Sequence, residues 1–439
     1  TKDVEFRKKK LIHLKDTIKK YEHDVILALK KDLNKSEFEA YATEIGIVYD
    51  SISYFLKNID EWVKPEPAKT PLHFQPGKSF IVRDPYGVVL IIGPFNYPFQ
   101  LVMEPLIGAI IGGNTAIVKP SEAALHTAAI VKKIINETFG EKYVRVVEGE
   151  KEEVTALIHA PFDYIFFTGS VAVGKVIAKA AAERLTPFCL ELGGKSPVIV
   201  DQTANIDVAV SRTAWGKFNN AGQTCVAPDY ILVHESVYDK FVKKMKKTIT
   251  EFYGKNIEES SDFGRIINTR QFDRLQDLLN KEVKNITFGG KTNREKLYVE
   301  PTILENVSWD NPIMEDEIFG PIMPIMKYDE LPLAIHKIRQ LPKPLSAYLF
   351  SEHEKAIDYF LDELSFGGGC INDVISHVGN MHLPFGGVGT SGVKAYHGKA
   401  TFENFTHPKS ILKRSSKLST DIVLPPYKNK VKLVRMIMK

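Results

Sequence analysis

Cysteine is scarce in this chain, whose 439 residues include only Cys189, Cys225 and Cys370. An odd number of widely separated cysteines excludes a disulfide framework and a paired Cys-x-x-Cys metal site, and it fits a reducing compartment. Long apolar runs are also absent, because the longest, around 88–92, is far shorter than the ~20 residues that a membrane span needs. The N-terminus lacks the apolar region of a signal peptide. We therefore expect a soluble, cytoplasmic protein.

The chain has little excess charge of either sign, because 58 Lys and Arg nearly balance 54 Asp and Glu, a net charge of +4. The excess lies at one end: from Lys409 onward there are nine basic residues and one acid, so residues 1–408 carry a net −4. A nucleic-acid-binding surface is disfavoured, because the basic residues form a tail without interleaved aromatics. For the tail at 417–439 we keep two interpretations, a solvated or packed terminus and a weak peripheral contact with anionic lipid.

The composition is otherwise that of a globular protein, with 44% hydrophobic and 26% charged residues, and the length suggests two or three domains. Apolar residues recur at helical spacing over 4–62. Prolines between 65 and 76 then break the helix before a short strand at 80–83.

From residue 86 onward, short apolar strands alternate with longer helical stretches. The first strands are expected at 88–92, 115–118, 143–147, 163–168 and 187–190, and the helices between and after them at 98–111, 122–138, 151–158 and 171–184. This alternation predicts a parallel, doubly wound α/β sheet with its ligands beyond the carboxyl ends of the strands. A second α/β run follows, with strands at 197–200, 230–233, 298–303, 322–326 and 346–350, and helices at 206–218, 236–252 and 354–364. The segment 366–392, rich in Gly and Asn, is expected to be a loop that forms part of a site.

Two glycine motifs resemble phosphate-binding sequences. Gly387-Val-Gly389-Thr-Ser-Gly392 spells G-x-G-x-x-G, but it follows Leu-Pro-Phe rather than a strand and has no acid about 20 residues later, so we interpret it as loop. Gly169-Ser-Val-Ala-Val-Gly-Lys-Val176 follows a strand but has Val176 where a P-loop has the hydroxyl that binds Mg²⁺. This helix start is therefore predicted to bind a pyrophosphate without a metal.

Four residues in separate segments are candidates for chemistry. Cys225 ends Gly-Gln-Thr-Cys, Glu191 ends an apolar strand before two glycines, Asn96 follows the strand at 88–92, and Glu317 begins Glu-Ile-Phe-Gly-Pro. Each has an ordinary alternative: a small buried thiol, a strand-end ion pair, a turn residue and a solvated carboxylate.

Taken together, these segments resemble the aldehyde dehydrogenase superfamily, in the right order and over nearly the whole chain. Val-Lys119-Pro-Ser-Glu, Phe167-Thr-Gly-Ser and Leu383-Pro-Phe-Gly-Gly also match. Gly-Gln-Thr-Cys225-Val-Ala-Pro-Asp-Tyr and Tyr396-His-Gly-Lys are most similar to class 3, the NAD(P)-dependent enzymes for fatty and aromatic aldehydes.

The resemblance implies an α/β fold with a Rossmann-type parallel sheet domain, a second α/β catalytic domain and a small β oligomerisation arm. The implied boundaries are 1–66 and 84–192 for the NAD(P)-binding domain, 193–400 for the catalytic domain, 67–83 and 401–416 for the arm, and 417–439 for the tail. The strand near 79–83 would pair with 402–415, and a homodimer is expected.

The resemblance also implies an oxidoreductase that converts medium-chain, long-chain or aromatic aldehydes to carboxylic acids with NAD(P) and water. Cys225 would attack the aldehyde to give a thiohemiacetal and then a thioester. Appreciable thiolate at neutral pH requires a lowered thiol pKa or a base. Glu191 would be that base, at least for the hydrolytic water, and the Asn96 side chain and the Cys225 N–H would stabilise the oxyanion.

For the cofactor, the resemblance implies that Lys119 and Glu122 hold the adenine ribose, Ser170 and the amides after Gly169 the pyrophosphate, and Glu317 the nicotinamide ribose. The full set of expected cofactor residues is Lys119, Ser121, Glu122, Thr168, Gly169, Ser170, Gly174, Leu192, Gly193, Glu317 and Phe319. Because a carboxylate at 122 repels a 2′-phosphate, NAD is expected to be preferred, with NADP possible through Lys119. Phe95 stands where a Trp is common, which keeps an aromatic wall.

No metal is expected, since His159, His377 and His382 lack ligand spacing, and we interpret these histidines as structural or surface residues. Three other functions remain open. A CoA-acylating aldehyde dehydrogenase would pass the thioester to CoA, but such enzymes commonly lack the base at 191. A non-catalytic protein could reuse the fold, and a thiol amidase would pair Cys225 with a histidine, although no Cys-His motif is visible.

Overall fold

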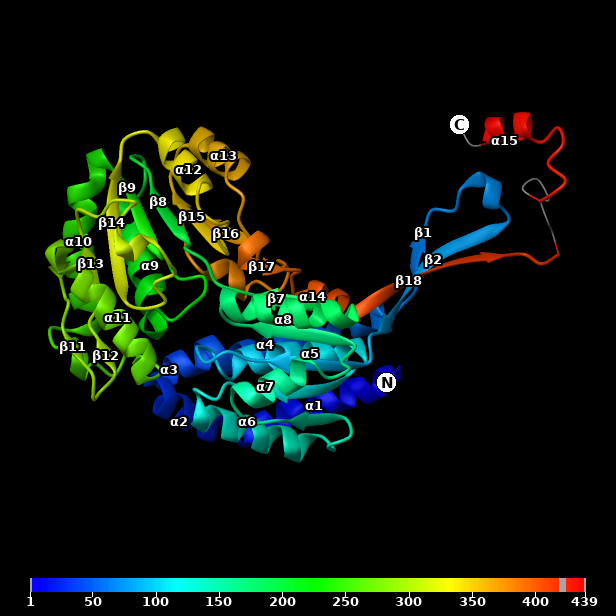
Figure 1. Ribbon diagram of the computed structural model, residues 1–439, viewed down its shortest axis with the longest axis horizontal. Coiled ribbons are helices and arrows are strands. Elements are labelled where there is room, and N and C mark those ends of the chain that lie inside the picture. Colours follow the sequence, from blue (N-terminus) through cyan, green and yellow to red (C-terminus); the bar gives the residue numbers. More distant parts are fainter. Residues whose placement is uncertain (1, 418–423, 438–439) are drawn as a thin grey trace.

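The computed structural model describes residues 2–417 and 424–437 of the chain (Figure 1). It contains two α/β units, each built on its own sheet, and a β arm that projects from them. The predicted α/β class is confirmed. Of the basic tail, residues 418–423 and 438–439 lie outside the described part.

The first sheet has six strands in the order β17-β7-β6-β3-β4-β5. Its strands are β3 (Val88–Ile92), β4 (Thr115–Lys119), β5 (Val144–Val146), β6 (Tyr164–Thr168), β7 (Phe188–Glu191) and β17 (Gly392–Val393). All neighbours run parallel except β17, which pairs antiparallel with β7. The five strands expected in this region are therefore present, and a short segment from far along the chain adds an edge.

Helices cover both faces of this sheet, as the apolar strands require. They are α5 (Gln100–Gly112), α6 (Leu125–Thr138), α7 (Lys151–Ile158) and α8 (Val171–Arg184). Alternate residues of β3 point into two different cores: Val89 and Ile91 join the core that contains α5 and α6, and Leu90 and Ile92 join the core under α8. This alternation is the two-residue period of a strand buried on both sides.

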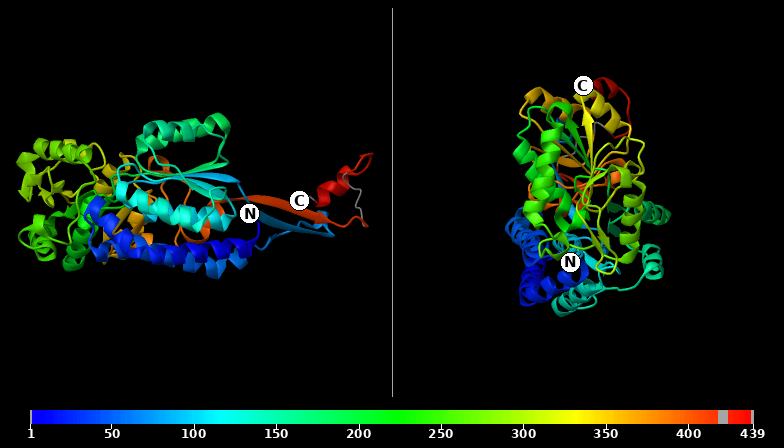
Figure 2. Two further views of the ribbon diagram at one scale, coloured as in Figure 1. Left: turned by 90° about the horizontal axis from the view of Figure 1, so that it is seen from below. Right: turned by 90° about the vertical axis from the view of Figure 1, so that its left-hand side faces the viewer.

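The N-terminal helices form a further layer over α5 and α6 (Figure 2). They are α1 (Val4–Lys20), α2 (Glu22–Leu33), α3 (Glu37–Ala40) and α4 (Gly46–Trp62), with a π-helical turn at Tyr41–Ile45. The helical spacing read from the sequence places Leu11, Leu14 and Ile18 in the buried core.

The second unit is a seven-stranded sheet in the order β10-β13-β14-β9-β8-β15-β16. Its strands are β10 (Ile286–Phe288), β13 (Thr302–Leu304), β14 (Ile322–Tyr328), β9 (Tyr230–His234), β8 (Pro197–Val200), β15 (Ser346–Phe350) and β16 (Gly368–Ile371). Its helices are α9 (Ile206–Phe218), α10 (Glu235–Tyr253), α11 (Thr269–Lys281), α12 (Leu331–Arg339) and α13 (Glu354–Glu363).

Two expectations for this unit are wrong in detail. The single strand expected at 298–303 is divided, because Pro301 has no N–H for a ladder bond: β12 (Tyr298–Val299) forms a hairpin with β11 (Thr292–Asn293), and only β13 joins the main sheet. The glycine-rich segment 366–392 begins with strand β16 rather than loop.

The projecting arm is a three-stranded antiparallel sheet of β1 (Glu66–Ala68), β2 (Gly77–Pro85) and β18 (Thr406–Arg414), clearly separated from the body in Figures 1 and 2. The expected pairing of these two regions is confirmed, in a register that runs from Thr406 opposite Pro85 to Arg414 opposite Gly77. The arm does not begin at 401, however. Residues 398–404 form α14, because Phe402 and Phe405 are buried in the core beside α5.

After the arm, residues 431–437 form a short helix, α15 (Val431–Ile437). Over residues 2–417 and 424–437, no helix is both long and apolar enough to cross a membrane.

Candidate functional site

The carboxyl ends of the parallel strands bring predicted site residues together. Lys119 ends β4, Thr168 ends β6 and Glu191 ends β7, while Asn96 lies in the loop after β3. These strand ends open into a cavity of about 860 Å³ that reaches the second unit. The predicted residues that line it are Asn96, Lys119, Ser121, Glu122, Thr168, Gly169, Ser170, Glu191, Leu192, Gly193, Cys225, Glu317 and Phe319.

Gly174 is not among the lining residues. A Cβ at this position in α8 would lie 2.6 Å from Leu192 Cδ2, so the glycine allows the helix to pack closely on the end of β7. Its expected role in holding a cofactor stays a prediction beside this packing role. Gly193 does line the cavity, and a Cβ there would lie 1.9 Å from Glu317 Oε2, so it leaves room for that carboxyl.

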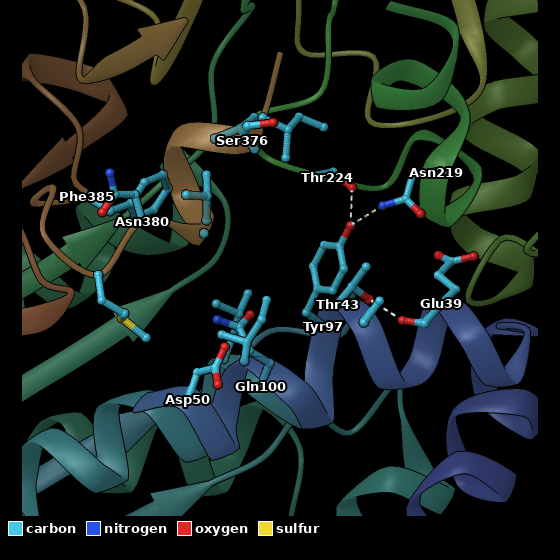
Figure 3. A pocket seen from close by; sticks show the side chains of 18 of the residues that line it. Glu39, Thr43, Asp50, Tyr97, Gln100, Asn219, Thr224, Ser376, Asn380 and Phe385 are labelled. Carbon is cyan, nitrogen blue, oxygen red and sulfur yellow. Dashed lines mark hydrogen bonds between the residues drawn. The ribbon is translucent and has the colours of Figure 1, made fainter. Parts of the chain in front are cut away.

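A second, larger cavity has a volume of about 1460 Å³, and Figure 3 shows part of its lining. Cys225 contributes to the lining of both cavities. A molecule in either cavity can therefore reach the thiol, which is the geometry required when a substrate and a cofactor must meet at one atom.

The loop that presents Cys225 has an unusual backbone. After α9 ends at Phe218, Asn220 and Ala221 have φ of 52° and 51°, and Gly222 has φ of 75°. A Cβ on Gly222 would lie 2.4 Å from the carbonyl carbon of Gly320, so only glycine fits here without a backbone shift. The Gly in Gly-Gln-Thr-Cys225 therefore lets the nucleophile's loop approach the segment that carries Glu317.

The environment of Cys225 does not favour a thiolate. Burial, followed by the nearby carboxyls of Glu317 and Glu191, raises the pKa of the Cys225 thiol to about 12. Of the two requirements given for thiolate, a lowered pKa is not met in this arrangement, so a base has to accept the thiol proton.

The two nearby carboxyls also hold protons more tightly than a free glutamate. Burial raises the pKa of Glu191 well above its ordinary value, with a hydrogen bond from Cys189 opposing the shift. Glu191 Oε1 accepts from Cys189 Sγ at 3.6 Å, and the buried Oε2 has no partner among the described residues. Burial, followed by the charge of Asp229, raises the pKa of Glu317 to about 8. Both groups are better bases at alkaline pH.

Asn96 is buried beside the loop of the nucleophile. Its Nδ2 donates to the backbone carbonyl of Gln223 at 3.0 Å, two residues before Cys225. Because a side-chain amide nitrogen carries two hydrogens, the second N–H of Asn96 can serve a substrate oxygen.

The smaller cavity has the features of a dinucleotide site. Lys119, which is buried, donates to Glu122 Oε2 at 2.6 Å and lowers the pKa of that carboxyl against the effect of partial burial. Ser170 caps α8 by accepting from the Val173 N–H at 3.4 Å, so the positive end of the helix lies at the cavity. Thr168 Oγ1 is buried without a partner in the described chain, and a bound molecule can satisfy it.

Aromatic rings and loops complete this cavity. Phe95 and Phe319 meet edge to face with ring centroids 5.8 Å apart, which forms an aromatic wall. Among the residues the structure describes, no group of three His, Cys, Asp or Glu side chains is placed to hold a metal ion. With its helix start and hydroxyls, the cavity suits a pyrophosphate.

The G-x-G-x-x-G sequence forms a loop, as predicted, although it ends in the short edge strand β17. A 3₁₀ turn over Gly389–Ser391 leads into β17, and the Leu192 N–H donates to the Ser391 carbonyl at 3.1 Å. The loop supports the end of β7 rather than binding a phosphate through a helix start.

The three histidines singled out in the sequence, His159, His377 and His382, are structural or surface residues, and one of them makes an unexpected contact. His159 lies 3.5 Å from Glu183 on the surface, and His382 Nδ1 lies 3.4 Å from the Tyr54 hydroxyl. A Cys–His contact does exist, because Cys370 Sγ lies 3.5 Å from His377 Nδ1. It does not involve Cys225, so it gives no support to a thiol amidase.

The larger cavity is formed by residues that sequence reasoning missed. One wall comes from the N-terminal helical region, for which the sequence predicted helices but no site. Its lining residues at 43, 47, 50, 54 and 57 have the spacing of one helix face. Tyr97 lies beside Thr43, and its hydroxyl lies 2.7 Å from Thr224 Oγ1 and accepts from Asn219 Nδ2 at 3.3 Å (Figure 3). The sequence signal that could have indicated this wall is the mixture of polar and apolar residues on one helix face, as in Thr43, Ile47 and Asp50.

Comparisons with known proteins find similar sequences and a similar structure. Residues 1–411 match the model of the aldehyde dehydrogenase family. A relative from Staphylococcus aureus, 4,4′-diaponeurosporen-aldehyde dehydrogenase, is 56% identical over 100% of this chain and 96% of its own length. Aldehyde dehydrogenase family 3 member A2 of Pongo abelii is 44% identical over 95% of this chain and 86% of its own. A solved structure of the substrate-bound state of Staphylococcus aureus AldH superposes with a TM-score of 0.98 at 55% identity, covering 100% of this chain and 95% of that one.

Proposed function

The chain belongs to the aldehyde dehydrogenase family and oxidises aldehydes to carboxylic acids with NAD or NADP, and we propose that Cys225, Asn96 and Glu191 carry out the reaction. The observation that carries this assignment is the position of Cys225, which lines both cavities. In this proposal the aldehyde occupies the larger cavity and the cofactor the smaller one. Residues 1–66 and 84–192 then form the cofactor domain, and 193–400 the catalytic domain.

The first half of the reaction forms a bond between Cys225 Sγ and the aldehyde carbon. The thiol gives its proton to a base as it attacks, and the carbonyl oxygen becomes an oxyanion that accepts from the Asn96 side chain and the Cys225 N–H. Bound NAD or NADP supplies a hydride acceptor, which converts the thiohemiacetal into a thioester. The residues proposed to hold the cofactor are Lys119, Ser121, Glu122, Thr168, Gly169, Ser170, Leu192, Gly193, Glu317 and Phe319.

The second half hydrolyses the thioester. Glu191 accepts a proton from water as the water attacks the acyl carbon, and the Cys225 thiolate leaves. The presence of a carboxyl at 191 favours water over CoA as the acceptor. Acid production without added CoA tests this choice, and a strict requirement for CoA would establish the alternative.

We expect NAD to be preferred over NADP. The Glu122 carboxylate accepts ribose hydroxyls and repels a 2′-phosphate. Lys119 already neutralises part of that charge through its 2.6 Å ion pair, which is why NADP remains usable. Comparable kcat/KM values for the two cofactors would overturn the preference.

The larger cavity supports long apolar aldehydes as substrates. Its volume of about 1460 Å³ exceeds that of most small-molecule pockets. Phe38, Trp215 and Phe252 line it while each remains more than a third exposed, which suggests an apolar entrance. The aldehyde in the name of the Staphylococcus aureus relative is one candidate. The test is NADH formation across a series of aldehydes of increasing chain length, without CoA; a kcat/KM that falls with chain length would contradict the assignment.

We also propose that the arm joins two copies of the chain. In the order β1-β2-β18, the outer edge of β18 is not paired with another strand of the described chain. An exposed strand edge is a ready surface for a second chain. A monomeric mass in light scattering would contradict the dimer.

The proposed location is the cytoplasm, with weak peripheral attachment to anionic membranes. All three cysteines are free thiols, as a reducing compartment allows. In the tail, Val431, Leu433 and Met436 are exposed beside Lys432 and Arg435 in the short helix α15. Mixed cations and apolar side chains give marginal membrane binding when they act alone.

A further inference from the structure

The loop that carries Asn96 is held from behind by a fully buried ion pair. Lys35 follows α2, and Glu44 lies in the π-helical turn before α4. Lys35 Nζ lies 2.5 Å from Glu44 Oε1, and both side chains have 0% exposure. The same ammonium donates to the backbone carbonyl of Asn96 at 3.1 Å and lies 4.0 Å above the centre of the Tyr97 ring.

Glu44 holds the same loop at its other end. Its Oε2 accepts from the N–H groups of Phe99 at 2.9 Å and Gln100 at 3.1 Å, where α5 begins. A carboxylate is favoured at a helix start because it faces unpaired N–H groups and the positive end of the helix dipole. One ion pair therefore holds the Asn96 loop at two points, the carbonyl of Asn96 and the start of α5.

The nucleophile's loop is tied to the same carbonyl from the opposite side. Asn220 Nδ2 donates to the Asn96 carbonyl at 2.8 Å and to the Gln223 carbonyl at 3.0 Å. Asn96 Nδ2 donates to the same Gln223 carbonyl. The ion pair and Asn220 together fix the loop that holds the proposed oxyanion donor relative to the loop that holds Cys225.

Stability alone is a weak reason for this arrangement. Two charges removed from water incur a desolvation penalty, and replacement of such a pair by apolar residues is often neutral or stabilising. Short π-helical segments such as 41–45 frequently occur at functional sites. Neither Lys35 nor Glu44 lines either cavity, so any effect on the reaction has to pass through the residues that they hold. These are Asn96 and, in the lining of the larger cavity, Tyr97 and Gln100.

We propose that Lys35 and Glu44 are positioning residues that aim the Asn96 side-chain amide at the oxyanion. This inference rests on the proposed role of Asn96 as an oxyanion donor. Because an oxyanion donor acts in the transition state, the effect of the pair through Asn96 is expected on kcat. A change confined to KM would instead show that the pair acts on substrate binding through Tyr97 or Gln100, and it would overturn the proposal.

The experiment is a double-mutant cycle on the full-length enzyme. Lys35→Met/Glu44→Leu is made in the wild-type background and in Asn96→Ala, and steady-state kcat and KM are measured with decanal and NAD. Asn96→Ala alone is expected to lower kcat by about 10²- to 10³-fold. Replacing the ion pair is expected to lower kcat by roughly 10- to 100-fold with little change in KM, and to have almost no further effect when Asn96 is already alanine.

Each outcome decides the matter. An equal loss of kcat in both backgrounds, or no loss in either, overturns the positioning role. If Asn96→Ala alone leaves kcat unchanged, Asn96 is not an oxyanion donor, and the positioning proposal that rests on this role fails with it. Acylation by p-nitrophenyl acetate, which needs the oxyanion but no cofactor, is expected to show the same non-additivity.

Two further variants separate positioning from folding. Lys246→Met/Glu305→Leu removes a partly buried ion pair with a 2.7 Å contact in the second unit, and it is expected to leave kcat unchanged. Glu44→Gln keeps the shape of the side chain, so it serves if the apolar double variant does not fold. It is expected to lower kcat less, again only when Asn96 is present; a loss in the Asn96→Ala background would overturn the proposal.

Discussion

At the scale of single residues, the reaction depends on protons held more tightly than usual. The Cys225 thiol has its pKa raised to about 12, and the pKa of Glu191 is also raised by burial. The sequence predicts which residue types are present, because thiol, carboxyl and amide each occur in a distinctive motif. It does not predict their pKa values, because the burial comes from segments far apart in the chain: Asn96 and Cys225 are 129 residues apart, and Cys225 and Glu317 are 92 residues apart.

Glu191→Gln is expected to stop the enzyme after the first half of the reaction. A glutamine cannot accept the proton of the hydrolytic water, and a general base contributes about 10²- to 10⁴-fold to rate. A rapid-mixing experiment is expected to show a burst of about one NADH per active site and then almost no turnover. Mass spectrometry of the quenched enzyme then detects an acyl group on Cys225. Normal turnover would move the base role to another group, with Glu317 as the first candidate.

The pH dependence of kcat follows from the raised pKa of Glu191. A carboxyl is a base only above its pKa, so hydrolysis of the thioester is expected to be slow in mild acid and to accelerate as the pH rises through that raised value. A profile of kcat from about pH 5 to about pH 10 checks this. A kcat that is already constant at about pH 5 would show that Glu191 is ionised there or is not the base.

At the scale of elements, the five parallel strands of the first sheet were predictable because each is a short apolar run. The helices around them were predictable because their apolar residues recur at helical spacing. β6 and α8 are correct to within a residue at each end. The errors arise where a local signal conflicts with tertiary packing. Phe402 and Phe405, for example, are buried in the core beside α5, so the arm begins later than 401.

The turn before Cys225 gives a test at this scale. Gly222→Ala is expected to lower kcat and to destabilise the protein by more than the roughly 1–2 kcal/mol of a left-handed alanine, because its Cβ would meet the Gly320 backbone. Gly254→Ala is the matched control: Gly254 has φ of 81° with nothing within 4 Å of the added Cβ. Thermal unfolding and kcat of both variants are compared, and equal effects would refute a special requirement at Gly222.

At the scale of the whole molecule, the net charge of +4 combines a net −4 over residues 1–408 with an excess of basic residues from Lys409 onward, which lie in both the arm strand β18 and the tail. The larger cavity could not be anticipated, since its wall is one face of the N-terminal helices placed against segments near 215, 252 and 380. Such a meeting of distant segments leaves only a weak trace in sequence periodicity.

Deletion of residues 428–439 tests whether the tail binds membranes. The expected result is reduced co-sedimentation with vesicles that contain anionic lipid, and unchanged activity on a short water-soluble aldehyde. Vesicles of neutral lipid provide the control, because the cations of the tail have no attraction for them. Unchanged co-sedimentation would exclude a role for the tail.

The junction at Cys225 also has a pharmacological consequence. The two cavities have Cys225 in common, and their other lining residues differ. Compounds that fill one cavity therefore leave most of the other free. Inhibitors of the two kinds can then occupy one subunit together. A single compound that joins both would have to pass beside the sulfur, where a mild electrophile placed in its linker would be held for covalent capture.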